Sequence, residues 1–220
     1  MSEKTDNFQV FDPLAVENVG VTLAVELLEQ PLQPMPPVSE FPGAGIYALY
    51  YSGEHEAYSS FIKLDKRKSK YPIYIGKAAG QSSKQGFRSQ SGGQKKLYDR
   101  ICQHAASIAE VSNLDIKHFR CRFLVLNDAY ISLAESVMIR VFRPPWNGMS
   151  FGSKVVGKNR MKGKPSLWDS LHPGRGGRPA GSADRAKEAA LLIASRVDEL
   201  KSEISDPTIS RMNQRISRFV

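Results

Sequence analysis

The chain has 220 residues, enough for one substantial hydrophobic core with an appended subdomain. Its 31 lysines and arginines outnumber its 22 aspartates and glutamates, and the net charge of +9 favours a polyanionic partner, either nucleic acid or a membrane surface. The only cysteines, Cys102 and Cys121, are too few for a structural zinc site and indicate buried thiols in a reducing compartment. Because no apolar run is long enough to cross a membrane and residues 1–10 lack a signal-peptide pattern, we expect a cytoplasmic protein.

Residues 1–43 are expected to form an N-terminal helical extension. Between residues 14 and 30, Val16, Val19, Leu23 and Leu27 recur near helical spacing, which predicts a helix that Gly20 weakens. Residues 31–42 contain five prolines and are predicted to be an extended connector.

Two short apolar runs, GIYALYY at residues 45–51 and PIYIG at residues 72–76, are predicted strands because aromatic and β-branched residues dominate them. On the first strand Tyr47 and Leu49 should point to one face, and Ile46 and Ala48 to the other. If the strands are neighbours, the phenols of Tyr47 and Tyr74 can lie on one side of a small sheet. Tyrosines in strands are usually packing residues, so these two alone do not decide between packing and chemistry.

Basic segments flank the second predicted strand. Residues 52–71 are too long for a tight hairpin turn, and their positive charges fit either a solvated face or a contact with phosphate. Residues 77–96 are rich in Gly, Ser and Gln and are predicted to form a basic loop. The basic residues are Lys63, Lys66, Arg67, Lys68 and Lys70 in the first segment, and Lys77, Lys84, Arg88, Lys95 and Lys96 in the second.

A helix is predicted from residue 97, because an apolar stripe repeats at helical spacing through Leu97, Ile101, Ala105 and Ile108. Arg100 and His104 occupy the neighbouring stripe, so their side chains should lie side by side. Residues 118–126 alternate in polarity and then become apolar, which predicts a third strand.

Residues 130–142 are apolar on nearly all sides and predict a buried helix with Glu135 in its middle. A carboxylate in such a place is costly unless it is paired or bound to a metal. A salt bridge, for instance to Arg100, is one interpretation, and a metal ligand is the one we favour. Pro144 and Pro145 should end the helix just before Asn147.

The last third of the chain is basic and then amphipathic. Residues 148–178 are glycine-rich and contain Trp168, which fits either a segment that lies on DNA or a solvated loop. Residues 183–204 are predicted to form a helix that caps the core or pairs two subunits. The basic residues of the first segment are Lys154, Lys158, Arg160, Lys162, Lys164, Arg175 and Arg178, and the apolar face of the helix comprises Ile193, Val197, Leu200 and Ile204.

Taken together, these motifs resemble the GIY-YIG nuclease superfamily over residues 45–147. The resemblance rests on residues that occur in one order: the GIY and YIG tripeptides, Arg100 and His104 on a helix, Glu135 on a later helix, and Asn147 after it. The long gap between the tripeptides, His104, and the segment SLWDSLHPGR at residues 166–175 are similar to the type II restriction endonuclease branch. Enzymes of that branch cut a palindrome of the CCGCGG type.

The resemblance implies an α+β fold: a small, mainly antiparallel three-stranded sheet flanked by helices, with N- and C-terminal helical extensions. It divides the chain into an extension (1–43), a catalytic core (44–147) and a basic DNA-contacting segment with a helix (148–220). The candidate catalytic residues are Tyr47, Tyr74, Arg100, His104, Glu135 and Asn147. The candidate DNA contacts are Lys77, Arg88, Lys154, Lys158, Arg160, Lys162, His172 and Arg175, with Arg175 a candidate for a guanine edge.

The resemblance also implies roles. Tyr47 would deprotonate or orient the attacking water with His104 as its partner, Arg100 would hold the scissile phosphate, and Tyr74 would complete the phenol pair. Asn147 would fix either the local backbone or a hydrogen bond to one of the catalytic residues. The sequence shows no cluster of carboxylates for a two-metal site, so one Mg²⁺ on Glu135 is expected.

The expected partner is double-stranded DNA, cut by a symmetric homodimer, and a cognate DNA methyltransferase would act on the same site. Two other functions stay open at this point: a non-catalytic DNA-binding module, and a GIY-YIG nuclease of the repair or mobile-element type.

Overall fold

The structure is a computed structural model that describes residues 15–65, 70–79, 94–152, 165–203 and 214. Several of the predicted basic residues lie outside this part of the chain: Lys66, Arg67, Lys68, Lys84, Arg88, Lys154, Lys158, Arg160, Lys162 and Lys164. Ile204, at the end of the last predicted helix, also lies outside it.

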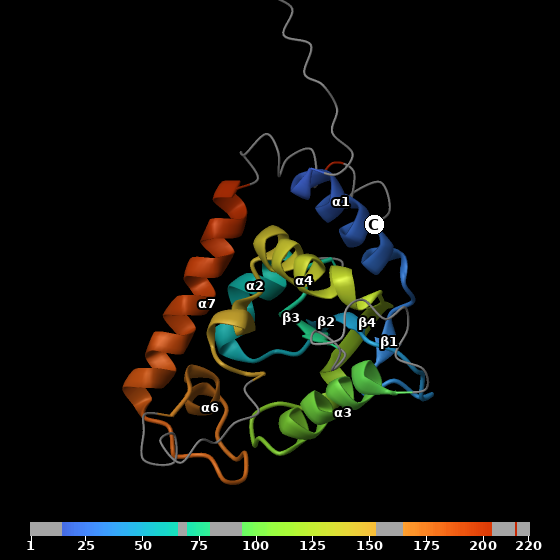
Figure 1. Cartoon of the computed structure of the whole chain (residues 1–220). Helices are drawn as coiled ribbons and strands as arrows, with labels where there is room; N and C mark the ends of the chain where they lie inside the picture. The colour runs from blue at the N-terminus through green and yellow to red at the C-terminus, as the bar shows by residue number, and fades with distance from the viewer. Residues whose placement is uncertain (1–14, 66–69, 80–93, 153–164, 204–213, 215–220) are drawn as a thin grey trace, which may run out of the picture.

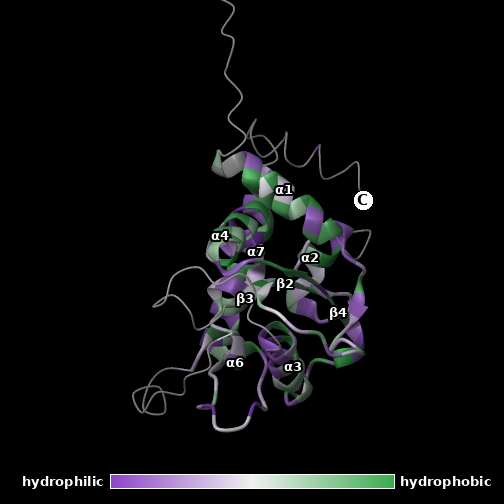
Figure 2. Ribbon diagram, turned by 45° about the vertical axis from the view of Figure 1, so that its right-hand side comes forward, coloured by the Kyte–Doolittle hydropathy of each residue, from purple (hydrophilic) through white to green (hydrophobic). Residues whose placement is uncertain are grey.

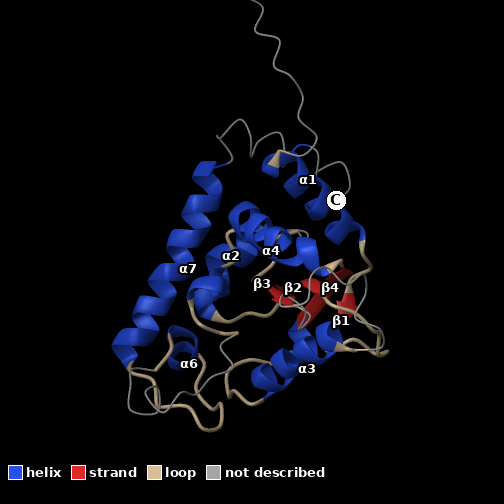
Figure 3. Ribbon diagram, in the orientation of Figure 1, coloured by secondary structure: helices blue, strands red, loops and turns tan. Residues whose placement is uncertain are grey.

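One antiparallel sheet lies at the centre of the molecule, with its strands in the order β1-β4-β2-β3 (Figures 1 and 3). Its strands are β1 (Gln33–Pro34), β2 (Gly45–Tyr51), β3 (Tyr74–Ala78) and β4 (Phe119–Val125). The structure confirms the predicted α+β fold and its three strands but adds β1, where Gln33 and Pro34 pair with β4. The proline-rich connector gave no sign of this strand, because proline cannot donate to a ladder and is tolerated only at an edge.

The register places both motif tyrosines on one face. Tyr47 lies opposite Gly76, and Tyr74 lies opposite Leu49, so the two tyrosines are diagonal neighbours across the β2–β3 pair. The glycine of the YIG tripeptide is required here, because a Cβ added at Gly76 would meet the Tyr47 hydroxyl oxygen at 2.3 Å.

Helices cover both faces of the sheet. Helix α3 (Lys96–Ala109) lies against the face that carries Tyr47, and α4 (Asp128–Phe142) with α1 (Val16–Glu29) covers the other (Figure 1). The Asn127 side chain caps the start of α4 by accepting the Ala129 N–H at 3.1 Å. This helix ends at Arg143, which has a left-handed backbone and precedes two prolines.

The C-terminal helix α7 (Ala183–Glu203) packs along the side of the molecule against α2 (Ser59–Leu64), α6 (Leu167–Leu171) and η4 (Pro145–Gly148). Ile193, Val197 and Leu200 are buried there, which confirms that its apolar face caps the core. Two further 3-10 turns are η1 (Glu56–Tyr58) and η3 (Ile116–His118). In the described part of the chain, no helix has the length and apolarity to span a bilayer.

Four expectations need correction. Helix α4 is not buried all round: it is mostly hydrophobic (Figure 2), but Ser132, Ser136 and Arg140 line an exposed face. The predicted loop at 77–96 is shorter, because Lys77 belongs to β3 and Lys96 begins α3. Residues 52–71 include η1 and α2, which the positive charge of the segment did not predict.

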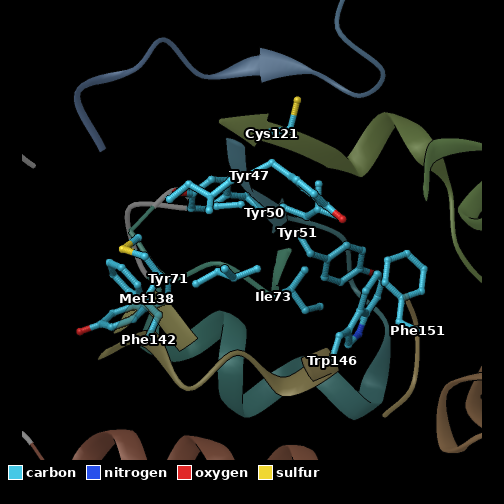
Figure 4. Packing of buried hydrophobic residues seen from close by; sticks show 14 of the residues in the cluster. Tyr47, Tyr50, Tyr51, Tyr71, Ile73, Cys121, Met138, Phe142, Trp146 and Phe151 are labelled. Atoms are coloured by element: carbon cyan, nitrogen blue, oxygen red, sulfur yellow. The ribbon is translucent and has the colours of Figure 1, made fainter. Parts of the chain in front are cut away.

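The fourth correction concerns the boundary at residue 147. Met149, Phe151 and Trp168 are buried in the same hydrophobic cluster as Trp146 and the sheet residues, and Figure 4 shows Phe151 beside Trp146. The packing therefore continues past Asn147, and the segment that follows it is part of the core.

Candidate active site

The centre of the site is a hydrogen bond between Tyr47 on β2 and His104 on α3. The Tyr47 hydroxyl oxygen lies 2.6 Å from His104 Nε2, and both residues are buried. The family resemblance implied this pairing, and the sheet register together with the helical stripe of α3 accounts for it.

Tyr74 and Arg100 lie beside this pair. We call the four residues Tyr47, Tyr74, Arg100 and His104 the tyrosine wall. The Tyr74 ring centroid lies 6.1 Å from that of Tyr47 and 5.2 Å from that of His104. Arg100 Nη1 donates to Gln103 Oε1 at 3.2 Å, and Nη2 donates to the carbonyl oxygen of Gly152. Four of the predicted catalytic side chains therefore meet in one place.

Electrostatics keep both phenols protonated in the free protein. Burial raises the pKa of Tyr47 well above its ordinary value, the neighbouring Tyr74 raises it further, and the charge of Arg100 lowers it. Burial also raises the pKa of Tyr74, and there Arg100 acts in the opposite direction. At neutral pH each phenol can thus donate a hydrogen bond, and Arg100 is the group that favours its ionised form.

Glu135 lies on α4, at the other side of the sheet edge formed by β3. Its Oε2 is 2.8 Å from the ammonium of Lys77, which also donates to Ser132 Oγ at 3.3 Å. The ion pair is therefore with Lys77 and not with Arg100, and the Glu135 side chain is 20% exposed. Its helix leaves one face open, so this carboxylate is accessible from solvent.

The side chains near this edge show how the predicted metal ion could be held. The described residues contain no group of three or more His, Cys, Asp or Glu side chains that could hold an ion. Glu135 already attracts one cation, the Lys77 ammonium, and a single hard carboxylate suits Mg²⁺ that takes its other ligands from water and phosphate. The residues present therefore fit one ion held by Glu135.

Asn147 clamps the backbone of β3. Its Oδ1 accepts the Ile75 N–H at 2.9 Å, and its Nδ2 donates to the Ile75 carbonyl oxygen at 2.7 Å. In the sheet formed by the described residues β3 is an edge strand, and Asn147 supplies a partner for both the N–H and the carbonyl of Ile75. Its contact is the backbone contact that was expected of it.

A basic groove opens beside these residues. It has a volume of about 720 Å³ and is lined by Lys77, Lys95, Lys96 and Arg100, together with Ala78, Ala79, Gln94, Asp99 and Gln103. Lys95 pairs with Glu40 in this structure. The groove joins Arg100 of the tyrosine wall to Lys77 of the Glu135 pair, and its positive charge suits a phosphate backbone.

Two predicted DNA contacts lie in the interior instead. His172 is fully buried, and Arg175 is 8% exposed, with its Nη2 2.7 Å from Asp169 Oδ1 and its Nε donating to the same oxygen at 2.8 Å. Neither side chain is presented to DNA in this structure. Reading them as DNA contacts was wrong because their turn packs onto the core, whereas the basic composition of the segment suggested an open loop.

Sequence reasoning also missed Phe151 and Gly152. The Phe151 ring stacks on His104 with centroids 4.6 Å apart, and Gly152 accepts the bond from Arg100. The only signal was an aromatic residue within a glycine-rich basic stretch, which the sequence analysis did not single out.

Comparison with known proteins agrees with this geometry. A search of curated proteins finds no match. A family model described as the Eco29kI GIY-YIG domain matches residues 39–201, which include every element from β2 to most of α7. Because this match covers most of the chain and contains the assembled site, the protein belongs to the Eco29kI GIY-YIG domain family of restriction endonucleases.

Proposed function

We propose that this protein is a Mg²⁺-dependent type II restriction endonuclease that hydrolyses both strands of double-stranded DNA at a short G/C-rich palindrome of the CCGCGG type. The observation that carries the proposal is the hydrogen bond between Tyr47 and His104, set beside Arg100 at the end of a basic groove. A tyrosine–histidine hydrogen bond can also be structural, so the combination with Arg100 and the groove is what favours a catalytic role.

The proposed chemistry begins with a water that attacks phosphorus as the bond to the leaving oxygen breaks. Tyr47 donates its hydrogen to His104 Nε2, which requires the ring hydrogen of His104 to be on Nδ1. As the water loses a proton to the phenol oxygen, His104 takes the phenol proton. No free phenolate has to form, although the pKa of Tyr47 is raised.

Arg100 supplies the positive charge for this reaction. It is free to exchange the Gly152 carbonyl for two phosphate oxygens, because a guanidinium binds phosphate through two parallel hydrogen bonds. In that position it also favours the transient loss of a proton from Tyr47, since its charge lowers the pKa of both phenols. Tyr74 packs against the His104 ring and would limit the access of bulk water to it.

Glu135 would hold the Mg²⁺, which when bound stabilises negative charge on the phosphate oxygens. The Lys77 ammonium that now neutralises Glu135 would then turn to the DNA backbone, in the groove that it already lines. Lys95 and Lys96 line the same groove and are expected to contact phosphates.

The test compares Glu135→Gln with Glu188→Gln, an exposed carboxylate on α7 whose ion-pair partner is Arg185. We expect wild type and Glu188→Gln to linearise a plasmid that contains the site in Mg²⁺, and EDTA to stop both. Glu135→Gln should bind the same DNA but cut it on the order of a thousandfold more slowly or not at all. Cutting by Glu135→Gln at near the wild-type rate would exclude this carboxylate as the metal ligand.

Specificity and assembly are tested together. Sequenced fragment ends should lie at one palindrome, and two chains should bind each site, since one chain holds one constellation and a two-fold dimer matches a two-fold sequence. Binding of one chain per site with single-strand nicks would contradict the homodimer, and DNA binding without any cleavage would favour a non-catalytic module.

A further inference from the structure

The backbone just after Asn147 folds over the tyrosine wall. Met149 is tied at both sides, since its N–H donates to the Trp146 carbonyl at 3.0 Å and its carbonyl accepts from Trp168 at 3.1 Å. Ser150 then adopts a left-handed backbone with φ of 63°, which is unusual for a residue with a side chain. This turn directs Phe151 inward.

Phe151 lies on the candidate catalytic residues. Its ring is 1% exposed, stacks on His104 with an interplanar angle of 27°, and meets Tyr74 edge-on at 5.2 Å. Its other side is packed by Trp146 at 4.5 Å and Trp168 at 4.7 Å. The His104 imidazole therefore has a rigid aromatic surface against it, which restricts rotation about its χ angles.

The next residue continues this contact. A Cβ added at Gly152 would meet the Tyr74 hydroxyl oxygen at 2.2 Å and Arg100 Nη2 at 3.3 Å, so a side chain does not fit here. Gly152 and Phe151 together touch His104, Tyr74 and Arg100, although both lie beyond the residues that define the motif.

A buried ion pair supports the position of Phe151. Arg175 Nη1 donates to the Phe151 carbonyl oxygen at 3.4 Å, while Asp169 holds the same guanidinium. The guanidinium also lies over the Trp168 ring, 4.9 Å from its centroid. The backbone of Phe151 is thus fixed from the side away from the site.

We infer that Phe151 is a positioning residue for the nuclease reaction: it holds the His104 ring in the orientation that accepts the Tyr47 proton, and Arg175 with Asp169 holds Phe151. This inference rests on the proposed function. It assigns to the segment after Asn147 a role in catalysis in place of the DNA contact that its basic composition suggested.

The test uses matched losses of one buried ring. Phe151→Leu removes the ring against His104, and Phe119→Leu removes a buried ring that contacts Tyr51 and Trp146 but none of the candidate catalytic residues. Both variants should lose similar amounts of unfolding free energy, because both lose a buried ring to the same replacement. Phe151→Met serves as a second variant in case Phe151→Leu does not fold.

Two readouts are taken on each folded variant. The first is the cleavage rate constant with enzyme in excess, beside the dissociation constant for DNA without divalent metal. We expect Phe151→Leu to cut at least about tenfold more slowly than Phe119→Leu, with affinities within about twofold.

The second readout is the ring nitrogen NMR spectrum, which is simple because the chain has 4 histidines. His104 should show one neutral tautomer in wild type and Phe119→Leu, and a mixture of tautomers in the Phe151 variants. An unchanged His104 tautomer, or equal cleavage rates for the two leucine variants, would overturn the inference. If wild type cuts no DNA, the proposed function fails separately, and the spectra alone still decide whether Phe151 orients His104.

Discussion

Within the described residues, two tyrosine hydroxyls are hydrogen-bonded to histidine rings, and the two pairs differ in what surrounds them. At the groove, the Tyr47 hydroxyl lies 2.6 Å from His104 Nε2. Beneath α7 and α6, the Tyr58 hydroxyl lies 2.5 Å from His172 Nε2. We call Tyr47–His104 the outer pair and Tyr58–His172 the inner pair. The chemistry of the two pairs is the same, so such a pair alone does not identify a catalytic site.

In the inner pair every hydrogen is assigned by its neighbours. Asn113 Oδ1 can only accept, so His172 Nδ1 carries the ring hydrogen, and His172 Nε2 must accept from Tyr58. Trp146 Nε1 in turn donates to the Tyr58 oxygen at 2.8 Å. This network joins η1, η4 and the end of α6; Tyr58, Trp146 and His172 are fully buried, and Asn113 closes it from the surface.

In the outer pair the decisive neighbours are Arg100 and the groove. The Arg100 charge lowers the pKa of Tyr47 against the effect of burial, whereas the hydrogen bond from Trp146 is the main influence that lowers the pKa of Tyr58. Because Arg100 lines the groove, a phosphate bound to it there would lie next to the outer pair. The inner pair has the same donors and acceptors, and its neighbours use them to hold the fold together.

The largest expected effect is at Arg175, which lies between the two pairs because it contacts both the Phe151 backbone and the Trp168 ring. Arg175→Ala leaves Asp169 charged and buried, so we expect the unfolding free energy to fall by about 3–5 kcal/mol in urea titrations. Asp169→Asn with Arg175→Met should recover part of this loss. A stable Arg175→Ala protein with weaker binding to its cognate DNA alone would instead restore the base-contact role.

Arg100→Ala removes the feature that separates the outer pair from the inner one. Cleavage with enzyme in excess should slow on the order of a hundredfold, because a charge-stabilising group is lost, while thermal stability changes little. Arg120→Ala, on the exposed side of β4, is the matched control and should cut normally. A decrease that only follows the folded fraction would make Arg100 a structural residue.

For the inner pair we expect a smaller effect, a dependence of the unfolding free energy on pH. Burial lowers the pKa of His172 from 6.5 to about 3, and the neighbouring His55 acts in the same direction. The unfolded chain therefore takes up a proton that the folded chain does not, so stability is fully present above pH 6.5 and is lost as pH falls towards 3.

Measured against His172→Gln, the wild-type unfolding free energy should fall by up to about 1.4 kcal/mol more per pH unit in this window. The difference between the two proteins cancels the carboxylates that titrate in the same range. Parallel pH profiles for the two proteins would show that His172 is already protonated in the fold.

The family resemblance implied the outer pair, and local patterns were compatible with it, whereas neither pointed to the inner pair. Alternation on β2 and the four-residue spacing of Arg100 and His104 on α3 are local patterns that determine which side chains share a face. Nothing local links Tyr58 to His172, because 114 positions separate them and charge patterns obscured both segments. A contact between residues so far apart in the chain produces no periodic pattern in the sequence.

The same reasoning explains the other differences. Glu135 was expected to be buried because its helix is apolar in composition, but small and hydroxyl-bearing residues on one side of α4 leave that side open to solvent. Arg175 was expected on DNA because glycines and lysines surround it, whereas its own partner, Asp169, comes from α6. The average composition of a segment does not reveal which few of its residues pack onto the core.

The most direct test of the account compares Tyr47→Phe with Tyr58→Phe, one hydroxyl removed from each pair. For Tyr47→Phe we expect cleavage to slow by about a hundredfold or more while the unfolding free energy changes by less than about 1 kcal/mol. For Tyr58→Phe we expect a loss of about 2 kcal/mol in stability, because Trp146 and His172 each lose a partner, and a wild-type cleavage rate per folded molecule. If Tyr47→Phe cuts DNA at the wild-type rate, or if both variants lose activity only through unfolding, the assignment of the outer pair to catalysis is contradicted.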